Sequence, residues 1–223
     1  MPTAALDLSP AEQAEMFAAW GEKPELFVED VLGATLWEKP REILRALAEP
    51  RARIAIRGCH RSSKTWALGH AACWFVATGG CVITTAPTGA QVELIWREIR
   101  GAFKRSRFPL GGEMLIHEWK DGQETLAIGR STDKPERIQG ANRAKVLIIG
   151  DEAPGIRSGV LDGIEGIRSG GDVRQVLAGN PTPIGGPFYE AFHKDRATWT
   201  GITIDAFDTP NLKGLTEDRI RKM

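Results

Sequence analysis

From Arg53 onward, short apolar runs rich in Val and Ile alternate with segments that are long enough to form helices. Runs such as VLII and CVITT are apolar without alternation, which is typical of strands buried on both faces of a sheet. This order of elements predicts an α/β domain with a mainly parallel sheet and helices on both faces. The expected strands are ARIAIRG, CVITTAP, AKVLIIGDE, RQVLAGNP and TGITIDAF, and the expected helices cover about 64–77, 90–103, 160–167 and 188–193.

Two further strands, MLIHEW and TLAIGR, flank the dipeptide Asp121-Gly122. Asp-Gly between two apolar runs is a strong signal for a tight turn that joins antiparallel strands. We therefore expect a β-hairpin in the middle of the domain.

The first 50 residues have a different pattern and a different charge. Helical spacing of apolar residues begins after Pro10 and again from about Pro40 to Ala48. The net charge of zero is a sum of opposites, because residues 1–50 hold ten Asp and Glu against four Lys and Arg, while the remainder holds 19 against 25. We expect a helical arm over 1–50, an α/β core over 51–207 and the start of a linker over 208–223.

Composition excludes several classes of protein. Hydrophobic residues make up 42% and charged residues 26%, close to globular averages, so the chain is not disordered as a whole. No apolar run reaches the roughly 20 residues of a membrane span, and the acidic N-terminus does not have the pattern of a signal peptide. Three cysteines without CxxC spacing favour neither a disulfide framework nor a zinc site, and they indicate a reducing, cytoplasmic setting.

A phosphate-binding pattern follows the first strand of the core. The segment GCHRSSKT fits G-x-x-x-x-G-K-[ST], the Walker A pattern, except that Ser63 replaces the second glycine. In such a loop, backbone N–H groups and a helix N-terminus hold the phosphates, Lys64 reaches the β- and γ-phosphates and Thr65 binds Mg²⁺. The alternative is an ordinary strand–turn–helix junction with Lys64 on the surface. The predicted nucleotide-binding residues are Gly58, Cys59, His60, Arg61, Ser62, Ser63, Lys64 and Thr65.

Two carboxylates come directly after the strand AKVLIIG. Asp151 is expected to hold Mg²⁺, and Glu152, which projects differently, could polarise an attacking water. The alternative is an acidic cap on the next helix. Together with Lys64 upstream, and with room for an additional strand between the two motifs, the pair favours hydrolysis of a nucleotide.

A third segment, VLAGNPT, places Asn180 and Thr182 after another strand, either to contact the γ-phosphate or to form a turn.

A basic cluster ends the helix expected over 90–103. Such a cluster can follow the phosphates of a nucleic acid, or it can be a solvated helix end whose cations favour the C-terminal dipole. Its members are Arg97, Arg100, Lys104, Arg105 and Arg107.

The chain resembles the ATPase domain of the large terminase subunit of tailed bacteriophages. The resemblance rests on GCHRSSKT, VITTAPTGAQVELIWREI, ERIQGANRAKVLIIGDEA, AGNPTPIGGPFYEAF and ITIDAFDTPNL, in this order. It runs from about Trp37 to Leu212 and implies an additional-strand (ASCE, RecA-like) phosphate-loop motor. Such a motor hydrolyses ATP with Mg²⁺ and drives double-stranded DNA into a viral capsid.

The resemblance also implies roles and partners. Lys64 and Thr65 would serve nucleotide and metal, Asp151 the metal, Glu152 catalysis, and Asn180 to Thr182 the coupling to movement. An arginine acting on a neighbouring subunit is expected at Arg137 or Arg143. The implied partners are a homo-oligomeric ring, the portal protein and the small terminase subunit, in the cytoplasm of an infected bacterium.

The chain departs from the family pattern at three points. Ser63 puts nucleotide affinity and turnover in question, and Pro40 stands where relatives often carry a Gln that reads adenine. The nuclease domain that usually follows is expected to be absent. Two other functions stay open: a phosphate-loop phosphotransferase that acts on a small molecule, and a nucleotide-binding assembly module without turnover.

Overall fold

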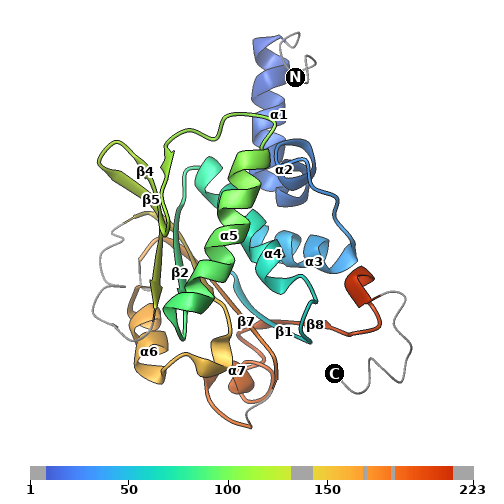
Figure 1. Ribbon diagram of the computed structural model, residues 1–223, viewed down its shortest axis with the longest axis vertical. Helices are drawn as coiled ribbons and strands as arrows, with labels where there is room; N and C mark the ends of the chain where they lie inside the picture. The colour runs from blue at the N-terminus through green and yellow to red at the C-terminus, as the bar shows by residue number, and fades with distance from the viewer. Residues whose placement is uncertain (1–8, 132–142, 168–169, 182–183, 213–223) are drawn as a thin grey trace.

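The computed structural model describes residues 9–131, 143–167, 170–181 and 184–212 (Figure 1). In these residues eight strands form one mixed sheet in the order β3-β4-β5-β2-β6-β7-β1-β8. The strands are β1 (Arg53–Gly58), β2 (Cys81–Ala86), β3 (Glu113–Met114), β4 (Glu118–Asp121), β5 (Glu124–Ser131), β6 (Lys145–Gly150), β7 (Asp172–Gly179) and β8 (Thr200–Ile204). From β5 to β8 in this order all neighbouring strands are parallel, whereas β4 pairs antiparallel with both β3 and β5. The predicted mainly parallel α/β fold is confirmed.

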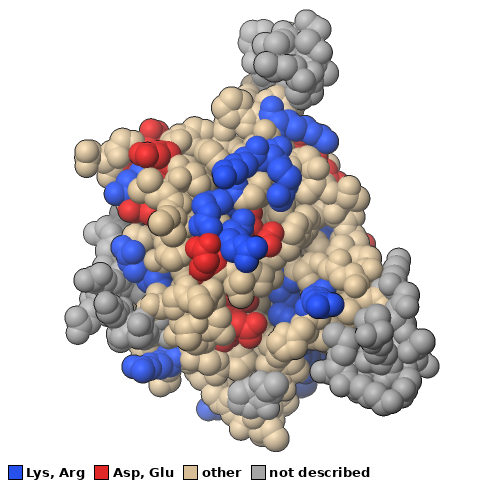
Figure 2. All heavy atoms as spheres, in the orientation of Figure 1, with Lys and Arg blue, Asp and Glu red and all other residues tan. Residues whose placement is uncertain are grey.

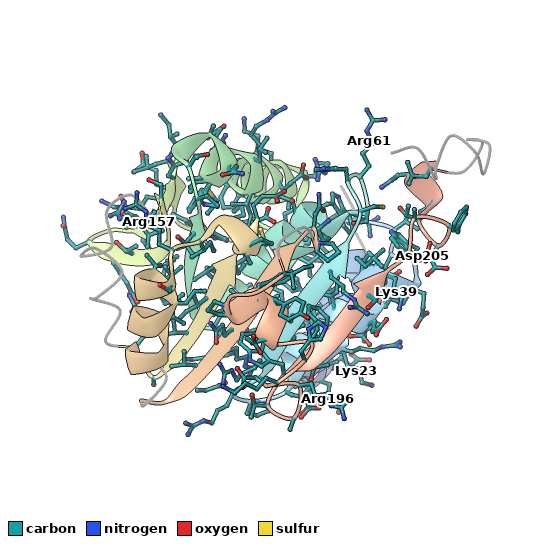
Figure 3. All side chains as sticks on the ribbon, turned by 90° about the horizontal axis from the view of Figure 1, so that it is seen from below. Lys23, Lys39, Arg61, Arg157, Arg196 and Asp205 are labelled. Atoms are coloured by element: carbon teal, nitrogen blue, oxygen red, sulfur yellow. The ribbon has the colours of Figure 1, made fainter. Side chains whose placement is uncertain are left out.

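Helices cover both faces of the sheet (Figures 1 and 3), because successive side chains of a strand point to opposite sides. In β6, Leu147 and Ile149 join one core with α4 and α5, whereas Val146 and Ile148 join a second core with α6. The helices are α1 (Pro10–Glu22), α2 (Pro24–Asp30), α3 (Glu38–Ala48), α4 (Lys64–Ala77), α5 (Gly89–Arg105), α6 (Ser158–Ile167) and α7 (Pro187–Glu190), with short 3₁₀ turns η3 (Ala153–Gly155) and η4 (Pro210–Leu212). No helix of the described residues is both long and apolar enough to cross a membrane.

The hairpin differs in part from its prediction. β4 and β5 pair up to Asp121 and Glu124, and Gly122, the first residue of the turn between them, takes a positive φ of 57°. MLIHEW, however, is not one strand: it splits into β3 and β4 at a turn in which the Leu115 amide donates to the Glu118 carbonyl, 2.7 Å away. Alternation of apolar residues could not reveal this turn, because it contains neither Gly nor Pro.

The additional strand expected between the two nucleotide motifs is present. β7 lies between β1 and β6 and pairs parallel with both. The carboxyl ends of the three strands therefore meet at one edge of the sheet, where ligands of open α/β sheets bind.

Residues 9–50, the part of the first 50 that the structure describes, form three helices, and α1 projects from the rest of the molecule (Figure 1). α2 and α3 are joined by ion pairs of Arg41 with Glu29 and of Arg45 with Glu25. At the end of α3, the buried Arg174 of β7 donates to the carbonyls of Leu47 and Ala48, 2.6 and 2.8 Å away. These contacts satisfy carbonyls that the end of a helix leaves without partners.

Candidate active site

The phosphate loop connects β1 to α4 at the carboxyl edge of the sheet. Ser63 stands at the N-cap of α4 with φ 63° and ψ 17°, in the left-handed region, and Arg61 has φ 62°. A side chain in this region costs roughly 1–2 kcal/mol, which explains why glycine is favoured at the position of Ser63. Gly58 has a different reason to be glycine, since an added Cβ would lie 3.0 Å from the Cβ of Ile204.

Lys64 turns back into its own loop. Its Nζ donates to the carbonyls of Gly58 and Cys59, both 2.8 Å away, and to the Ser62 hydroxyl at 3.2 Å. The side chain is buried, and the loss of water lowers its pKa, although the nearby Asp151 and Glu152 act in the opposite direction. The ammonium group is therefore held in place by oxygen atoms of its own loop.

Thr65 and Asp151 bring the two predicted motifs together. The Thr65 hydroxyl donates to Oδ2 of Asp151 at 2.8 Å, and the backbone N–H of Glu152 donates to Oδ1 at 3.0 Å. Asp151 follows β6 and is only 3% exposed, so burial raises its pKa, against the effect of both hydrogen bonds. The carboxylate is thus fixed beside the hydroxyl with which it was predicted to share a metal.

Glu152 has a backbone conformation of its own. Its φ of 50° is left-handed, and it caps the 3₁₀ turn η3. Strained residues of this kind cluster at functional sites. The half-buried Glu152 lines the cavity described below.

Asn180 follows β7 and contacts the phosphate loop from the neighbouring strand. Its Oδ1 accepts from Lys64 Nζ at 3.1 Å, and its amide nitrogen lies 2.8 Å from Nε2 of His60. Thr182, predicted to act with Asn180, lies outside the described residues.

A cavity of about 650 Å³ opens over the loop. Ligand pockets usually measure about 300–1,000 Å³, so a nucleotide has room here. Besides the loop and Glu152, its walls include residues that sequence reasoning missed: Thr35, Trp37, Trp66, Pro210 and Asn211. Arg61 extends away from the loop (Figure 3).

Asn211 is the most informative of the missed residues. Its amide donates to the Arg61 carbonyl at 2.9 Å and to the Ser63 hydroxyl at 2.7 Å. The sequence did contain one signal for it: a Pro-Asn pair follows the last strand of the core. Because the parallel strands of such a sheet all end at the same edge, residues that follow this strand lie near the phosphate loop.

Of the two candidate trans-acting arginines, the one that the structure describes, Arg143, does not join this site. Arg143 precedes β6, so it lies at the opposite edge of the sheet, where it pairs with Glu124 and donates to the Thr125 carbonyl at 3.2 Å. Arg137 lies outside the described residues.

The predicted basic cluster divides into two groups. Lys and Arg gather over α5 (Figure 2), and Arg97, Lys104 and Arg105 are exposed. Arg100 is instead half-buried and pairs with Glu93. Arg107 is exposed as well, but it donates to the backbone carbonyls of residues 29 and 30, both at 3.2 Å.

Comparison with solved structures finds the same fold in other proteins. The ATPase domain of the large terminase of Thermus phage P74-26 superposes with a TM-score of 0.56 at 18% identity, covering 82% of this chain and 85% of that one. The chain has the fold of a phage large terminase ATPase domain. The large terminases of another thermophilic bacteriophage and of bacteriophage HK97 give TM-scores of 0.61 at 15% and 10% identity, covering 83% and 91% of this chain.

This chain spans about half of those two terminases, 48% and 50% of their lengths. The first of the two has also been solved in complex with ADP, with a TM-score of 0.60 at 15% identity over 79% of this chain and 45% of that one. No protein-family model and no curated protein matches the chain. At such identities the likeness is one of fold, and the fold expected from the terminase resemblance is confirmed.

Proposed function

We propose that this chain is an Mg²⁺-dependent ATP hydrolase, the motor domain of a phage DNA-packaging machine. The observation that carries the proposal is that Lys64, Thr65 and Glu152 line one cavity, and that the Thr65 hydroxyl binds the buried Asp151. The terminase fold, and the terminase of a thermophilic bacteriophage that was solved with ADP, support a nucleotide as the ligand.

Lys64 is proposed to bind the β- and γ-phosphates. Its hydrogen bonds to the loop carbonyls and to Asn180 fix the ammonium group next to the N-terminus of α4. That helix terminus adds partial positive charge and free N–H groups, so phosphate oxygens would meet several donors at once.

Thr65 and Asp151 would hold Mg²⁺. A hydroxyl and a carboxylate oxygen 2.8 Å apart are hard oxygen donors of the kind this ion prefers, so the residues present fit it. The ion, when bound, would offset negative charge on the phosphates.

Glu152 is proposed to orient and deprotonate the attacking water. Its carboxylate belongs to a half-buried side chain at the cavity, while Asp151 is held by the Thr65 hydroxyl and the Glu152 amide. Separate carboxylates can then bind metal and accept a proton, because a metal-bound carboxylate is a poor base.

Asn180 is proposed to couple hydrolysis to movement. Its Oδ1 shares the Lys64 ammonium with the loop carbonyls, so a phosphate that attracts Lys64 competes with this contact. Loss and return of the contact would report the state of the nucleotide to β7.

Double-stranded DNA, a homo-oligomeric ring, the portal protein and the small terminase subunit are the proposed partners, in the cytoplasm of an infected bacterium. Arg97, Lys104 and Arg105 are exposed and would contact DNA phosphates. The place of Arg143 at the opposite edge of the sheet is compatible with action on a neighbouring subunit but not on its own site. Arg137 is the other candidate.

Two observations bear on the alternatives. The left-handed backbone of Ser63 supports turnover, because the loop takes the glycine-like geometry despite the substitution. Glu152 at the cavity favours water over another acceptor and therefore hydrolysis over phosphotransfer.

The test is release of inorganic phosphate from ATP by the purified chain, with Mg²⁺, over a range of protein concentrations. We expect a specific activity that rises with concentration, as completion of the site by a neighbour requires, and loss of activity in Lys64→Ala and Glu152→Gln. Glu152→Gln should still bind ATP, which separates catalysis from binding. Hydrolysis at the unmutated rate in Glu152→Gln would refute its role, and a phosphorylated small molecule in place of free phosphate would indicate a phosphotransferase.

A further inference from the structure

The phosphate loop contains two residues that are not glycine in the left-handed region, Arg61 and Ser63, with φ of 62° and 63°. Both are bound by one side-chain amide. Asn211 Nδ2 donates to the Arg61 carbonyl at 2.9 Å and to the Ser63 hydroxyl at 2.7 Å. The contact thus falls on the two points of the loop where the backbone is least favourable for an ordinary side chain.

Asn211 is itself held in place by buried neighbours. Thr209 and Leu212 are 1% and 3% exposed, and the Leu212 amide donates to the Thr209 carbonyl at 3.2 Å. Pro210 between them restricts the backbone before the asparagine. An exposed amide on a fixed 3₁₀ turn therefore reaches a loop that lies 148 residues earlier in the chain.

We propose that Asn211 is a positioning residue, which holds the phosphate loop in its nucleotide-binding shape by binding Ser63. Glycine at this position would relieve the backbone strain but would offer no hydroxyl to bind. Serine and asparagine would then act as a pair that replaces the glycine. A loop held in its bound shape binds more tightly, because less ordering remains to be done on binding.

The inference rests on the proposed function, since it assumes that the loop binds a nucleotide. Its test combines four variants with a readout that needs no nucleotide. The variants are Asn211→Ala, Ser63→Gly, the two together, and Gln123→Ala as a control that removes an exposed amide from the turn between β4 and β5.

The first readout is hydrogen–deuterium exchange of the full chain without nucleotide. Asn211→Ala should speed exchange of the segment 58–65 several-fold while the buried strand β2 keeps its rate, and Gln123→Ala should change neither. Faster exchange of both segments would mean that Asn211 only supports the fold as a whole, and the proposal would be wrong.

The second readout is ATP binding and hydrolysis. Loss of one hydrogen bond of ordinary strength corresponds to roughly a three- to tenfold change in binding. Asn211→Ala, which removes the hydrogen bonds to both Arg61 and Ser63, should raise the Kd and KM for Mg²⁺-ATP by at least that factor, with less effect on kcat. In the Ser63→Gly background only the bond to the Arg61 carbonyl remains to be lost, so the rise should be clearly smaller. An equal effect in both backgrounds would overturn the pairing. If the unmutated chain bound no ATP, the proposed function would fail, while the exchange experiment would still decide the role of Asn211.

Discussion

The buried carboxyl group of Asp151 should make the protein less stable at neutral pH than it would be without the charge. Burial raises its pKa, although hydrogen bonds from Thr65 and from the Glu152 amide act against burial. A raised native pKa means that the folded state binds more protons than the unfolded state. Stability therefore falls as pH rises from the unfolded pKa, about 3.9, through the native value.

Asp151→Asn removes the charge and can keep both hydrogen bonds. The new Oδ1 can accept from the Glu152 amide, while the new amide donates to the Thr65 hydroxyl, which becomes the acceptor. We therefore expect the free energy of unfolding at pH 7 to rise in the variant. Each unit by which the native pKa is raised corresponds to about 1.4 kcal/mol, so the size of the gain measures the shift. Lys64 reduces this gain, because it loses a nearby negative charge.

The measurement is urea unfolding from pH 4 to 8 without nucleotide or Mg²⁺. The stability difference between Asp151→Asn and the unmutated chain should grow with pH, while Mg²⁺-dependent ATP hydrolysis is lost. A variant that is less stable at pH 7, or a difference that does not change with pH, would refute the reasoning.

Asp172→Asn is the matched control, for which we expect the free energy of unfolding at pH 7 to change in the opposite direction. Burial opposes ionisation of Asp172, but hydrogen bonds from Arg174, 2.7 Å away, and from the Arg51 amide outweigh burial and lower its pKa. The charged form is then favoured in the folded state. This stabilisation is present above the unfolded pKa and is lost as pH falls through the native value, so Asp172→Asn should cost up to about 1 kcal/mol at pH 7.

Three further predictions concern the metal, the loop and DNA. Thr65→Val should raise the Mg²⁺ concentration for half-maximal ATPase activity about tenfold or more. Thr65→Ser should raise it far less, because only serine keeps a hydroxyl ligand. The same Mg²⁺ requirement in both variants would contradict the role of Thr65 as a metal ligand. Gly58→Ala should lower the free energy of unfolding by about 1–3 kcal/mol through overpacking, whereas Gly89→Ala, where nothing lies within 4 Å, should not. Replacing Arg97 and Lys104 by alanine should weaken DNA binding and reduce its salt slope by about two, and Arg107→Ala, whose cation already binds backbone carbonyls, should change the slope less.

Much of the fold was predictable because its signals are local. The helix Lys64–Ala77 agrees with its prediction, since it starts directly behind the loop pattern and ends before a pair of glycines. Val- and Ile-rich runs located the core strands. The split of MLIHEW was not predictable, because the turn that divides it contains neither Gly nor Pro.

The residues of the candidate site that belong to short sequence motifs could be predicted. The phosphate loop, Asp151 and Asn180 come together because parallel strands share a carboxyl edge. Asn211 was missed because its partners are 150 and 148 residues away, and no local pattern connects them. The basic cluster was predicted only in part, because the sequence does not show that Arg100 and Arg107 are bound to other parts of the fold.

β7 contacts the site at one end and the arm at the other. Behind its carboxyl end, Asn180 binds Lys64, and near its amino end Arg174 binds the last carbonyls of α3. Between these contacts the strand is hydrogen-bonded to β1 and β6 on both sides, over a length of roughly 25 Å for its eight residues. A strand held in this way cannot stretch or slip by itself. A pull on Asn180 would reach the arm as a nearly rigid displacement, so β7 would connect the nucleotide mechanically to the first 50 residues.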